Sequence, residues 1–357
     1  MRRPPIRQLV FRGGIEPDRI FHHNLWYRGH TNRRYEELLP RLERVDAYLL
    51  FLPEQRVARG IGYRLVGRSP GTRSWIVRAG SRAYRSAFVT EIEQVAWFEG
   101  PIVVDLDDPA FDEREVELLQ RPNVRAYTVT AEKAAQRFAE LGVDKPAHAV
   151  PQGAARVDPA AAAVARRRRR QGEIAVGYVA AHLLLGTDRG GSNPLYNVEH
   201  LLELWQEIRA RVPAARLWLV GAPSKTLRDR LARRDDVVLT GRLPPTRALA
   251  QVANFDLALY PRTEDQGIRA AKVAEYLGAG VPTVAYDYEV VADLRESGAG
   301  VLVSTPREFV TAVERLARDP LERSRLAAAA QAAGRARDWD VLAGEMAGIL
   351  DRYLSPS

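Results

Sequence analysis

Short apolar segments recur along the chain and alternate with longer segments in which apolar residues have helical spacing. The apolar segments are rich in Val, Leu, Ile and Ala and are bounded by Gly, Pro, Asp or Asn, a pattern typical of strands buried in a parallel sheet. Strands are predicted at residues 8–11, 45–52, 101–109, 123–130, 147–153, 174–179, 216–222, 236–242, 255–261, 283–286 and 298–304. Strands that alternate with helices predict an α/β fold built from βαβ units.

Helices are predicted at residues 83–98, 131–141, 198–211, 290–297, 307–319, 321–337 and 339–354. The series is interrupted at 154–172, where alanines run into five consecutive arginines (166–170) that no apolar face opposes. We interpret this stretch as a solvated linker or a frayed helix between domains. The chain is therefore predicted to comprise two Rossmann-like domains, 1–153 and 173–338, joined by this linker, and a terminal helix at 339–357.

The composition fits two domains and excludes cysteine chemistry. A chain of 357 residues with 46% hydrophobic residues can form two α/β cores without disulfides. The absence of Cys excludes disulfides, thiolate nucleophiles and Cys-based zinc sites. No apolar run approaches the ~20 residues that span a bilayer, and no apolar segment of a secretory signal follows the basic N-terminus. We therefore expect a cytoplasmic protein.

The formal net charge of +8 favours anionic partners. The excess comes from arginines spread over the chain, so nucleic acid is a weaker candidate than a nucleotide diphosphate. The arginine run at 166–170 predicts at most a weak peripheral contact with anionic lipids at the inner face of a membrane.

The stretch 265–286 is predicted to form a short helix followed by a buried strand, and it has the clearest chemical pattern. Lys272 and Glu275 are three residues apart, so a cation and a carboxylate project from one face of the helix. Gly267 precedes the helix and leaves backbone N–H groups uncovered at its N-terminus, where an anion can bind. An ordinary surface ion pair on a crossover helix explains the same residues equally well.

Three aspartates, Asp105, Asp107 and Asp108, lie at the end of the predicted strand 101–109. Like charges at short range repel each other, so the cluster indicates a divalent cation or groups that contact substrate hydroxyls. Asp107 and Asp108 are our candidate catalytic residues. The alternative is that acidic residues here, including Asp112, cap the following helix.

Two further patterns have simpler explanations. The strand 8–11 ends at Gly13 and Gly14, which line a ligand cleft or simply form a tight turn. Three histidines lack a carboxylate at metal-ligand spacing, so we do not interpret them as a metal site but as an acceptor-facing or loop feature. These are His22, His23 and His30.

The second domain begins with a strand, a long glycine-containing loop (180–192) and a helix, which is a phosphate-binding layout. Arg189 is the only Arg or Lys in this loop, and His182 lies near its start. Neither domain contains the Gly-x-Gly-x-x-Gly pattern of a dehydrogenase.

The segment Lys272-Val-Ala-Glu-Tyr-Leu-Gly-Ala-Gly-Val-Pro282 resembles the donor-binding helix of retaining, GT-B-fold glycosyltransferases of the family 4 type, in a branch with a Lys-x-x-Glu-Tyr signature. The strands at 216–222, 236–242 and 255–261 match this family's series in order and spacing, and the resemblance extends from about 101 to 303. It implies two Rossmann-like domains facing across a cleft, with the acceptor on the first and the nucleotide sugar on the second. It also implies that the terminal helix packs back towards the first domain.

The resemblance implies roles for individual residues. Glu275 would hold the ribose hydroxyls, while Lys272 and Arg189 would bind the diphosphate and Arg242 would meet the base. Asp107 and Asp108 would lie near the acceptor or sugar hydroxyls. The remaining residues implied for the donor site are Gly13, Gly14, His182, Gly221, Gly267, Ile268 and Arg269.

One position departs from the family pattern. Many members carry a second Glu near the sugar, where this chain has Gly267. The sequence therefore does not identify the donor sugar. No cofactor is implied beyond the donor substrate and no metal is needed, although the three aspartates leave a metal open.

The implied reaction is the transfer of a sugar from a nucleotide-diphosphate sugar to an acceptor hydroxyl of a glycan, a lipid-linked molecule or a specialised metabolite. A GT-B epimerase or an inverting transferase shares the fold and the nucleotide site. A non-catalytic, basic nucleic-acid-binding protein would explain the arginines but not the order of the motifs. The oligomeric state is expected to be a monomer or a dimer.

Overall fold

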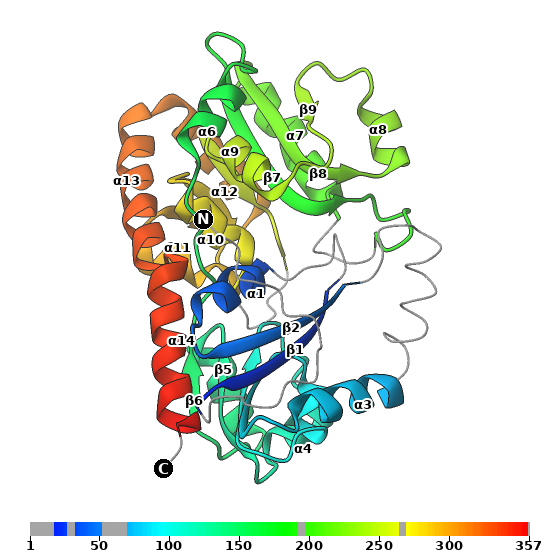
Figure 1. Ribbon diagram of the computed structural model, residues 1–357. Helices are drawn as coiled ribbons and strands as arrows, with labels where there is room; N and C mark the ends of the chain where they lie inside the picture. The colour runs from blue at the N-terminus through cyan, green and yellow to red at the C-terminus, as the bar shows by residue number, and fades with distance from the viewer. Residues whose placement is uncertain (1–17, 27–32, 52–69, 192–196, 264–268, 356–357) are drawn as a thin grey trace. The chain divides into compact units, whose positions relative to one another are not determined.

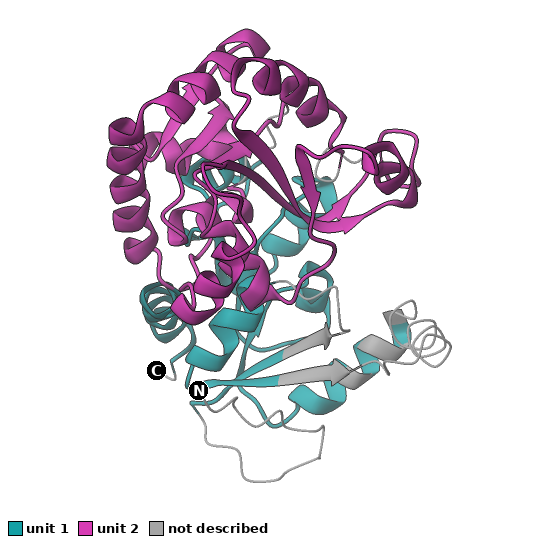
Figure 2. Ribbon diagram, turned by 90° about the horizontal axis from the view of Figure 1, so that it is seen from above, with its two compact units in different colours: residues 1–151, 339–357 teal, residues 152–338 magenta. Residues whose placement is uncertain are grey.

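The computed structural model describes residues 18–26, 33–51, 70–191, 197–263 and 269–355 and contains two compact units (Figures 1 and 2). Unit 1 contains the chain up to Pro151 together with residues 339–357, and unit 2 contains Gln152–Asp338. Within the described residues, each unit is built around one six-stranded parallel sheet. The predicted α/β fold of two Rossmann-like units is confirmed.

The sheet of unit 1 has the strand order β2-β1-β3-β4-β5-β6. Its central strands β3 and β4 are buried at every position, because helices cover both faces of such a parallel sheet. The strands are β1 (Ile20–Trp26), β2 (Val45–Phe51), β3 (Ser86–Val89), β4 (Ile102–Leu106), β5 (Val124–Val129) and β6 (Ala147–Ala149).

The last helix of the chain, α14 (Trp339–Leu354), belongs to unit 1 and contacts β3, β4 and β5 (Figure 1). It buries one apolar face that includes Trp339, Leu342 and Met346, which provides the stabilisation of an amphipathic helix on a sheet. The other helices described in this unit are α1 (Arg33–Leu38), η1 (Leu39–Arg41), α3 (Pro70–Ser81), η3 (Ile92–Ala96), α4 (Glu113–Leu119) and α5 (Glu132–Glu140).

The sheet of unit 2 has the strand order β12-β11-β10-β7-β8-β9. The order reverses between β7 and β10, and in open α/β sheets ligands bind beyond the carboxyl ends of the strands at this switch point. The strands are β7 (Ile174–Leu183), β8 (Ala215–Pro223), β9 (Val237–Leu239), β10 (Leu257–Tyr260), β11 (Thr283–Tyr286) and β12 (Gly300–Val303).

Helices and a large apolar core flank the sheet of unit 2. Two buried tryptophans anchor this unit, because the indole of Trp205 donates to Asp236 and that of Trp218 donates to Glu173. The helices are α6 (Pro159–Arg166), α7 (Glu199–Arg211), α8 (Lys225–Leu231), α9 (Pro245–Val252), α10 (Ala271–Gly278), η4 (Glu289–Val291), α11 (Ala292–Ser297), α12 (Pro306–Arg318) and α13 (Pro320–Ala336). No helix in the described ranges is long and apolar enough to cross a membrane.

Two local predictions are wrong. The helix predicted at 83–98 is instead strand β3 followed by the short helix η3. A central strand is apolar on both faces, and its periodicity does not separate it from a buried helix. His22, which we interpreted as an acceptor-facing or loop feature, is a buried residue of β1.

The arginine-rich stretch 154–172 lies within unit 2. Asp158 caps α6 by accepting from the N–H groups of Ala160 and Ala161, and α6 contacts α9. Arg169 forms an ion pair with Asp256 at the base of β10 and donates to the carbonyl of Asn254. Part of the basic run therefore fastens this segment to unit 2.

The replacement Gly177→Ala in the middle of β7 is expected to lower the free energy of unfolding by about 1–3 kcal/mol. A Cβ there would lie 2.1 Å from ring atoms of Phe255, which is buried below the sheet. Thermal and urea denaturation measure the effect. Gly348→Ala on α14 is the control, because nothing lies within 4 Å of its Cβ position and alanine favours a helix; equal effects of the two changes would contradict the packing explanation.

Candidate functional site

The carboxyl ends of β7 and β10 meet the start of helix α10 at the switch point of unit 2. Tyr178 comes from β7, Tyr260 from the last position of β10, and Lys272 from the first turn of α10. The Nζ of Lys272 donates to the hydroxyl of Tyr178 at 2.8 Å. It also lies 4.6 Å from the ring centroid of Tyr178 and 5.9 Å from that of Tyr260, which is within cation–π range. Two aromatic rings thus hold a lysine at the edge where ligands bind.

Lys272 is held in a setting that weakens its affinity for a proton. The pKa of Lys272 is lowered to about 8, chiefly because the side chain is desolvated by burial. The positive charge of Arg262 also lowers this pKa, while Tyr260 and Glu275 act in the opposite direction. A less hydrated ammonium group is a stronger partner for an incoming anion. The carboxylate of Glu275, three residues along α10, acts electrostatically on Lys272.

The tyrosine of the Lys-x-x-Glu-Tyr signature fixes the helix. Tyr276 is fully buried, and its hydroxyl accepts from the backbone N–H of Val179 at 3.2 Å. Val273 and Leu277 are also buried, so this face of α10 packs into unit 2. Because Tyr276 ties α10 to β7, it sets where Lys272 and Glu275 project.

Arg262 is a functional candidate that sequence reasoning missed. It follows β10 and is 8% exposed, and its Nη1 is 3.5 Å from the hydroxyl of Tyr260. Its Nε and Nη2 are buried and have no hydrogen-bond partner in the part of the chain that the structure describes. The sequence feature that could have identified it is an arginine next to Pro261, directly after a strand that reaches the switch point.

The other predicted donor-site residues lie along the same edge or outside the described residues. His182 is half-buried on β7, opposite Ala222 on β8, while Arg189 and Arg242 are exposed on the segments that follow β7 and β9. Gly221 has a φ of +149°, and a Cβ there would lie 1.9 Å from the carbonyl oxygen of Ala180, so the close approach of β7 requires glycine. The predicted residues Gly13, Gly14, Gly267 and Ile268 lie outside the described residues.

Arg269 is surrounded by carboxylates. It is 2.9 Å from Asp293, 2.7 Å from Glu296 and 3.6 Å from Glu289. Arg337 also pairs with Asp293, which is almost fully buried. This arrangement indicates that Arg269 anchors the entry to α10 on η4 and α11.

In unit 1, Asp105 is a structural residue. Its carboxylate is fully buried and accepts from the Nε and Nη2 of Arg34 at 2.8 and 3.0 Å, as well as from the hydroxyl of Thr128. Arg34 is equally buried and also donates to the carbonyl of Pro151 at 2.9 Å. The ion pair therefore ties α1 to β4, β5 and the segment that follows β6, and the carboxylate of Asp105 is engaged in this pairing.

Asp107 and Asp108 lie in the loop after β4, where Asp107 is half-buried and Asp108 is exposed. Asp112 caps α4 by accepting from the N–H of Glu115 at 2.8 Å, so the capping explanation applies to Asp112. Phe111, in the same loop, has a φ of +58°, a strained conformation for a bulky residue that is typical of functional loops. Asp107 and Asp108 are thus presented at the carboxyl edge of this sheet.

The metal-binding option gains no support from the described residues, which contain no group of three His, Asp or Glu side chains arranged to hold an ion. His22 is fully buried, and its Nδ1 lies 2.9 Å from the carbonyl oxygen of Phe88. Burial lowers the pKa of His22 to about 4, so it is neutral in the pH range of function. The side chain of His23 and all of His30 lie outside the described residues.

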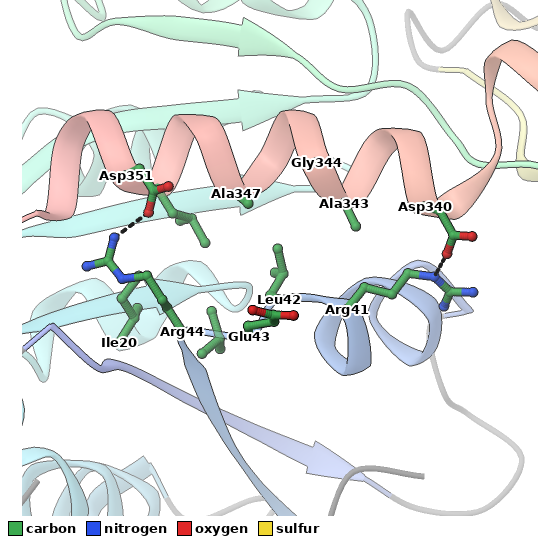
Figure 3. Close-up of a pocket in the computed structure, with 12 residues that line it drawn as sticks. Ile20, Arg41, Leu42, Glu43, Arg44, Asp340, Ala343, Gly344, Ala347 and Asp351 are labelled. Atoms are coloured by element: carbon green, nitrogen blue, oxygen red, sulfur yellow. Dashed lines mark hydrogen bonds and ion pairs between the residues drawn. The ribbon is translucent and has the colours of Figure 1, made fainter. Parts of the chain in front are cut away.

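A cavity of about 450 Å³ lies in unit 1 beside α14 (Figure 3). It is bordered by Ile20 and Val45, the first residues of β1 and β2. Ion pairs of Arg41 with Asp340 and of Arg44 with Asp351 span it, as Figure 3 shows. Because it lies at the amino ends of the strands, it is not at the edge where an α/β sheet binds its ligand.

Residues 189–319, in unit 2, match the sequence model of the family described as Glycosyl transferases group 1. The fold also matches solved structures along most of the chain. HepE from Anabaena, in complex with UDP-glucose, aligns with a TM-score of 0.68 at 15% identity over 93% of this chain and 100% of that one. The chain has the GT-B fold.

Other GT-B structures align over a similar length. Sucrose-phosphate synthase from Thermosynechococcus elongatus has a TM-score of 0.68 at 13% identity, over 94% of this chain and 99% of that one. Trehalose 6-phosphate synthase from Burkholderia multivorans has a TM-score of 0.64 at 13% identity, over 94% and 97%. A search of curated protein sequences finds no match.

Proposed function

We propose that the chain is a retaining glycosyltransferase of the family 4 type that moves a sugar from a nucleotide-diphosphate sugar to an acceptor hydroxyl. One observation carries this proposal. Lys272 and Glu275 project from one helix at the switch point of unit 2, inside the segment that matches the glycosyltransferase model. HepE, which shares the fold at low identity, binds UDP-glucose, and a nucleotide sugar is the donor class we propose for this chain.

The donor chemistry follows from the charges of unit 2. Transfer requires the diphosphate to leave while positive charge grows on the sugar ring, and a preorganised cation at the leaving oxygen lowers this barrier. Lys272 supplies such a cation together with the N-terminus of α10. Glu275 accepts hydrogen bonds from the ribose hydroxyls, and His182, Arg189, Gly221 and Arg242 line the rest of the donor site.

The acceptor chemistry is assigned to unit 1. Asp107 and Asp108 project from a strained loop at the carboxyl edge of its sheet, where carboxylates can orient acceptor or sugar hydroxyls. The acceptor is a glycan, a lipid-linked molecule or a specialised metabolite. The reaction uses the donor as a substrate and needs no cofactor and no metal.

We also propose a location, an oligomeric state and partners for the protein. We place the enzyme in the cytoplasm as a monomer or dimer with at most a weak peripheral membrane contact. We assign it no nucleic-acid partner, because arginines such as Arg34, Arg169 and Arg269 are engaged by carboxylates within their own unit.

Glu275→Ala is expected to abolish the response of the protein to its nucleotide. A UDP-, GDP-, dTDP- or ADP-sugar at 100 times its dissociation constant should stabilise the wild type by about 2.7 kcal/mol. The variant should lose most of this gain, because the ribose hydroxyls lose their acceptor. Thermal shift with the four nucleotide classes measures this and identifies the base.

Glu203→Ala on α7 is the matched control, because it removes a carboxylate that is 71% exposed on another helix of the same unit. It should respond to the nucleotide as the wild type does. If no nucleotide class stabilises the wild type, the transferase proposal fails.

Product stereochemistry separates this proposal from its enzymatic rivals. Proton NMR of the product should show the anomeric configuration of the donor, whereas an inverted anomer would indicate an inverting transferase. Conversion of the donor sugar without any acceptor would indicate an epimerase.

A further inference from the structure

Two cations, the buried Arg262 and the half-buried Lys272, lie near each other at the switch point of unit 2. Arg262 leaves β10 and Lys272 begins α10, and both lie at Tyr260, since Arg262 contacts its hydroxyl and Lys272 lies over its ring. The charge of Arg262 acts on both Lys272 and Tyr178. Two like charges this close repel each other, and burial adds a desolvation cost.

Arg262 differs from the buried Arg34 and the half-buried Arg269. Arg34 is satisfied by Asp105, and Arg269 by Asp293 and its neighbours. Arg262 instead has a single long contact with a neutral hydroxyl, and its Nε and Nη2 have no partner among the described residues. A guanidinium that is 8% exposed and has no counter-ion among the described residues carries an uncompensated desolvation cost.

The unpaired nitrogen atoms have a geometry that selects the ligand. A guanidinium presents its N–H groups as a planar fork that matches two oxygens of a phosphate, whereas an ammonium acts as a compact point charge. Arg262 and Lys272 together offer one group of each kind, framed by the rings of Tyr178 and Tyr260. This combination suits an anion with at least two charges and several oxygens.

We propose that Arg262, together with Lys272, binds the diphosphate of the donor substrate, an assignment that rests on the proposed function. The sequence pattern pairs Lys272 with Arg189, but Arg189 is exposed on the turn after β7, whereas the charge of Arg262 acts directly on Lys272. The incoming diphosphate supplies the missing counter-ion and satisfies Nε and Nη2. Binding thereby relieves the repulsion between the two cations.

The test compares the wild type with Arg262→Gln and Arg262→Lys in titrations with inorganic pyrophosphate, a nucleoside diphosphate and the matching nucleoside. Arg262→Gln should bind pyrophosphate and the diphosphate roughly 10 to 100 times more weakly, the loss expected for charge-assisted hydrogen bonds. Its affinity for the nucleoside should not change. Arg262→Lys keeps the charge but loses the forked geometry, so its affinity for pyrophosphate should lie between those of the wild type and Arg262→Gln.

Arg228→Gln on α8 is the control, because it removes an exposed positive charge from the same unit. It corrects for the change in net charge and should bind pyrophosphate as the wild type does. Isothermal titration calorimetry at fixed ionic strength measures all affinities.

Three results would overturn the proposal. The first is that Arg262→Gln binds pyrophosphate as tightly as the wild type does. The second is that Arg262→Gln loses as much affinity for the nucleoside as for pyrophosphate, which would mean that Arg262 shapes the pocket. The third applies if Arg262→Gln does not fold, and it is that Arg262→Lys binds pyrophosphate with wild-type affinity. If nucleoside diphosphates bind and Arg262→Gln does not weaken them, only this inference fails. If pyrophosphate binds through Arg262 while no nucleotide binds, the anion site stands and the proposed function fails.

Discussion

Asp105→Asn is expected to lower the free energy of unfolding by about 3–5 kcal/mol, the usual result of removing one partner from a buried ion pair. Arg34 and Asp105 both have 0% exposed side chains, so the guanidinium of Arg34 would remain charged inside unit 1 without a counter-ion. The asparagine offers one acceptor oxygen where the carboxylate accepts from Arg34 and Thr128. Urea denaturation measures the loss of stability. Hydrogen exchange of the amides in β4 and β5 assigns it to unit 1.

Asp108→Asn is the matched control, because Asp108 is exposed three residues later on the same segment. Its effect on stability should lie within about 0.5 kcal/mol. The double replacement Arg34→Met with Asp105→Leu should be less destabilising than Asp105→Asn, since it removes both charges. Equal stability of the Asp105→Asn and Asp108→Asn proteins would contradict the structural role of Asp105.

Most strands of the two sheets were predictable from the sequence, because buried parallel strands have a local pattern of apolar residues. The strand at 283–286 and the helix at 339–354 have the same bounds in the structure as in the prediction. Gly280 and Pro282 bound the strand on one side, and Trp339 opens the helix with a clear apolar period. Signals of this kind depend on neighbouring residues alone.

What the sequence missed depends on contacts between distant residues. Arg34 and Asp105 are 71 positions apart, and nothing local distinguishes this aspartate from Asp107. The polar residue His22 occupies a buried strand because the carbonyl of Phe88, 66 positions away, lies within hydrogen-bonding distance of its ring. Such pairings decide burial, and neighbouring residues do not encode them.

In the candidate site, too, features set by neighbouring residues were predictable and features set by distant contacts were not. The pattern of Lys272 and Glu275 on one face of a helix was predictable from their spacing. The position of Arg262 beside Lys272 was not, because it requires the order in which β7 and β10 pair in the sheet. The family resemblance directed attention to Arg189, whereas the topology brings Arg262 to the switch point.

Lys272→Met is expected to reduce turnover of the donor by about 10²- to 10³-fold, the range seen when one preorganised group that stabilises transition-state charge is removed. Methionine keeps the length of the side chain between the rings of Tyr178 and Tyr260 but cannot neutralise a departing phosphate. Release of the nucleoside diphosphate from the donor identified by thermal shift measures the rate. Lys225→Met is the control, because Lys225 is 85% exposed on α8; a loss below tenfold in Lys272→Met would exclude a role for Lys272 at the leaving group.

The titration of Lys272 provides a second, independent readout. Burial lowers its pKa from 10.5 to about 8, so kcat/KM of the wild type should fall as pH rises above about 8, when the free enzyme loses the proton. Between pH 8 and 10.5 the unfolded chain binds this proton and the folded chain does not. The penalty for burying the charge is therefore present in full below pH 8, and stability is regained as pH rises through this window. Lys272→Met removes this penalty, so its advantage in free energy of unfolding over the wild type should be largest below pH 8 and should shrink towards pH 10.5. If the difference in free energy of unfolding between the two proteins does not vary with pH, Lys272 titrates normally.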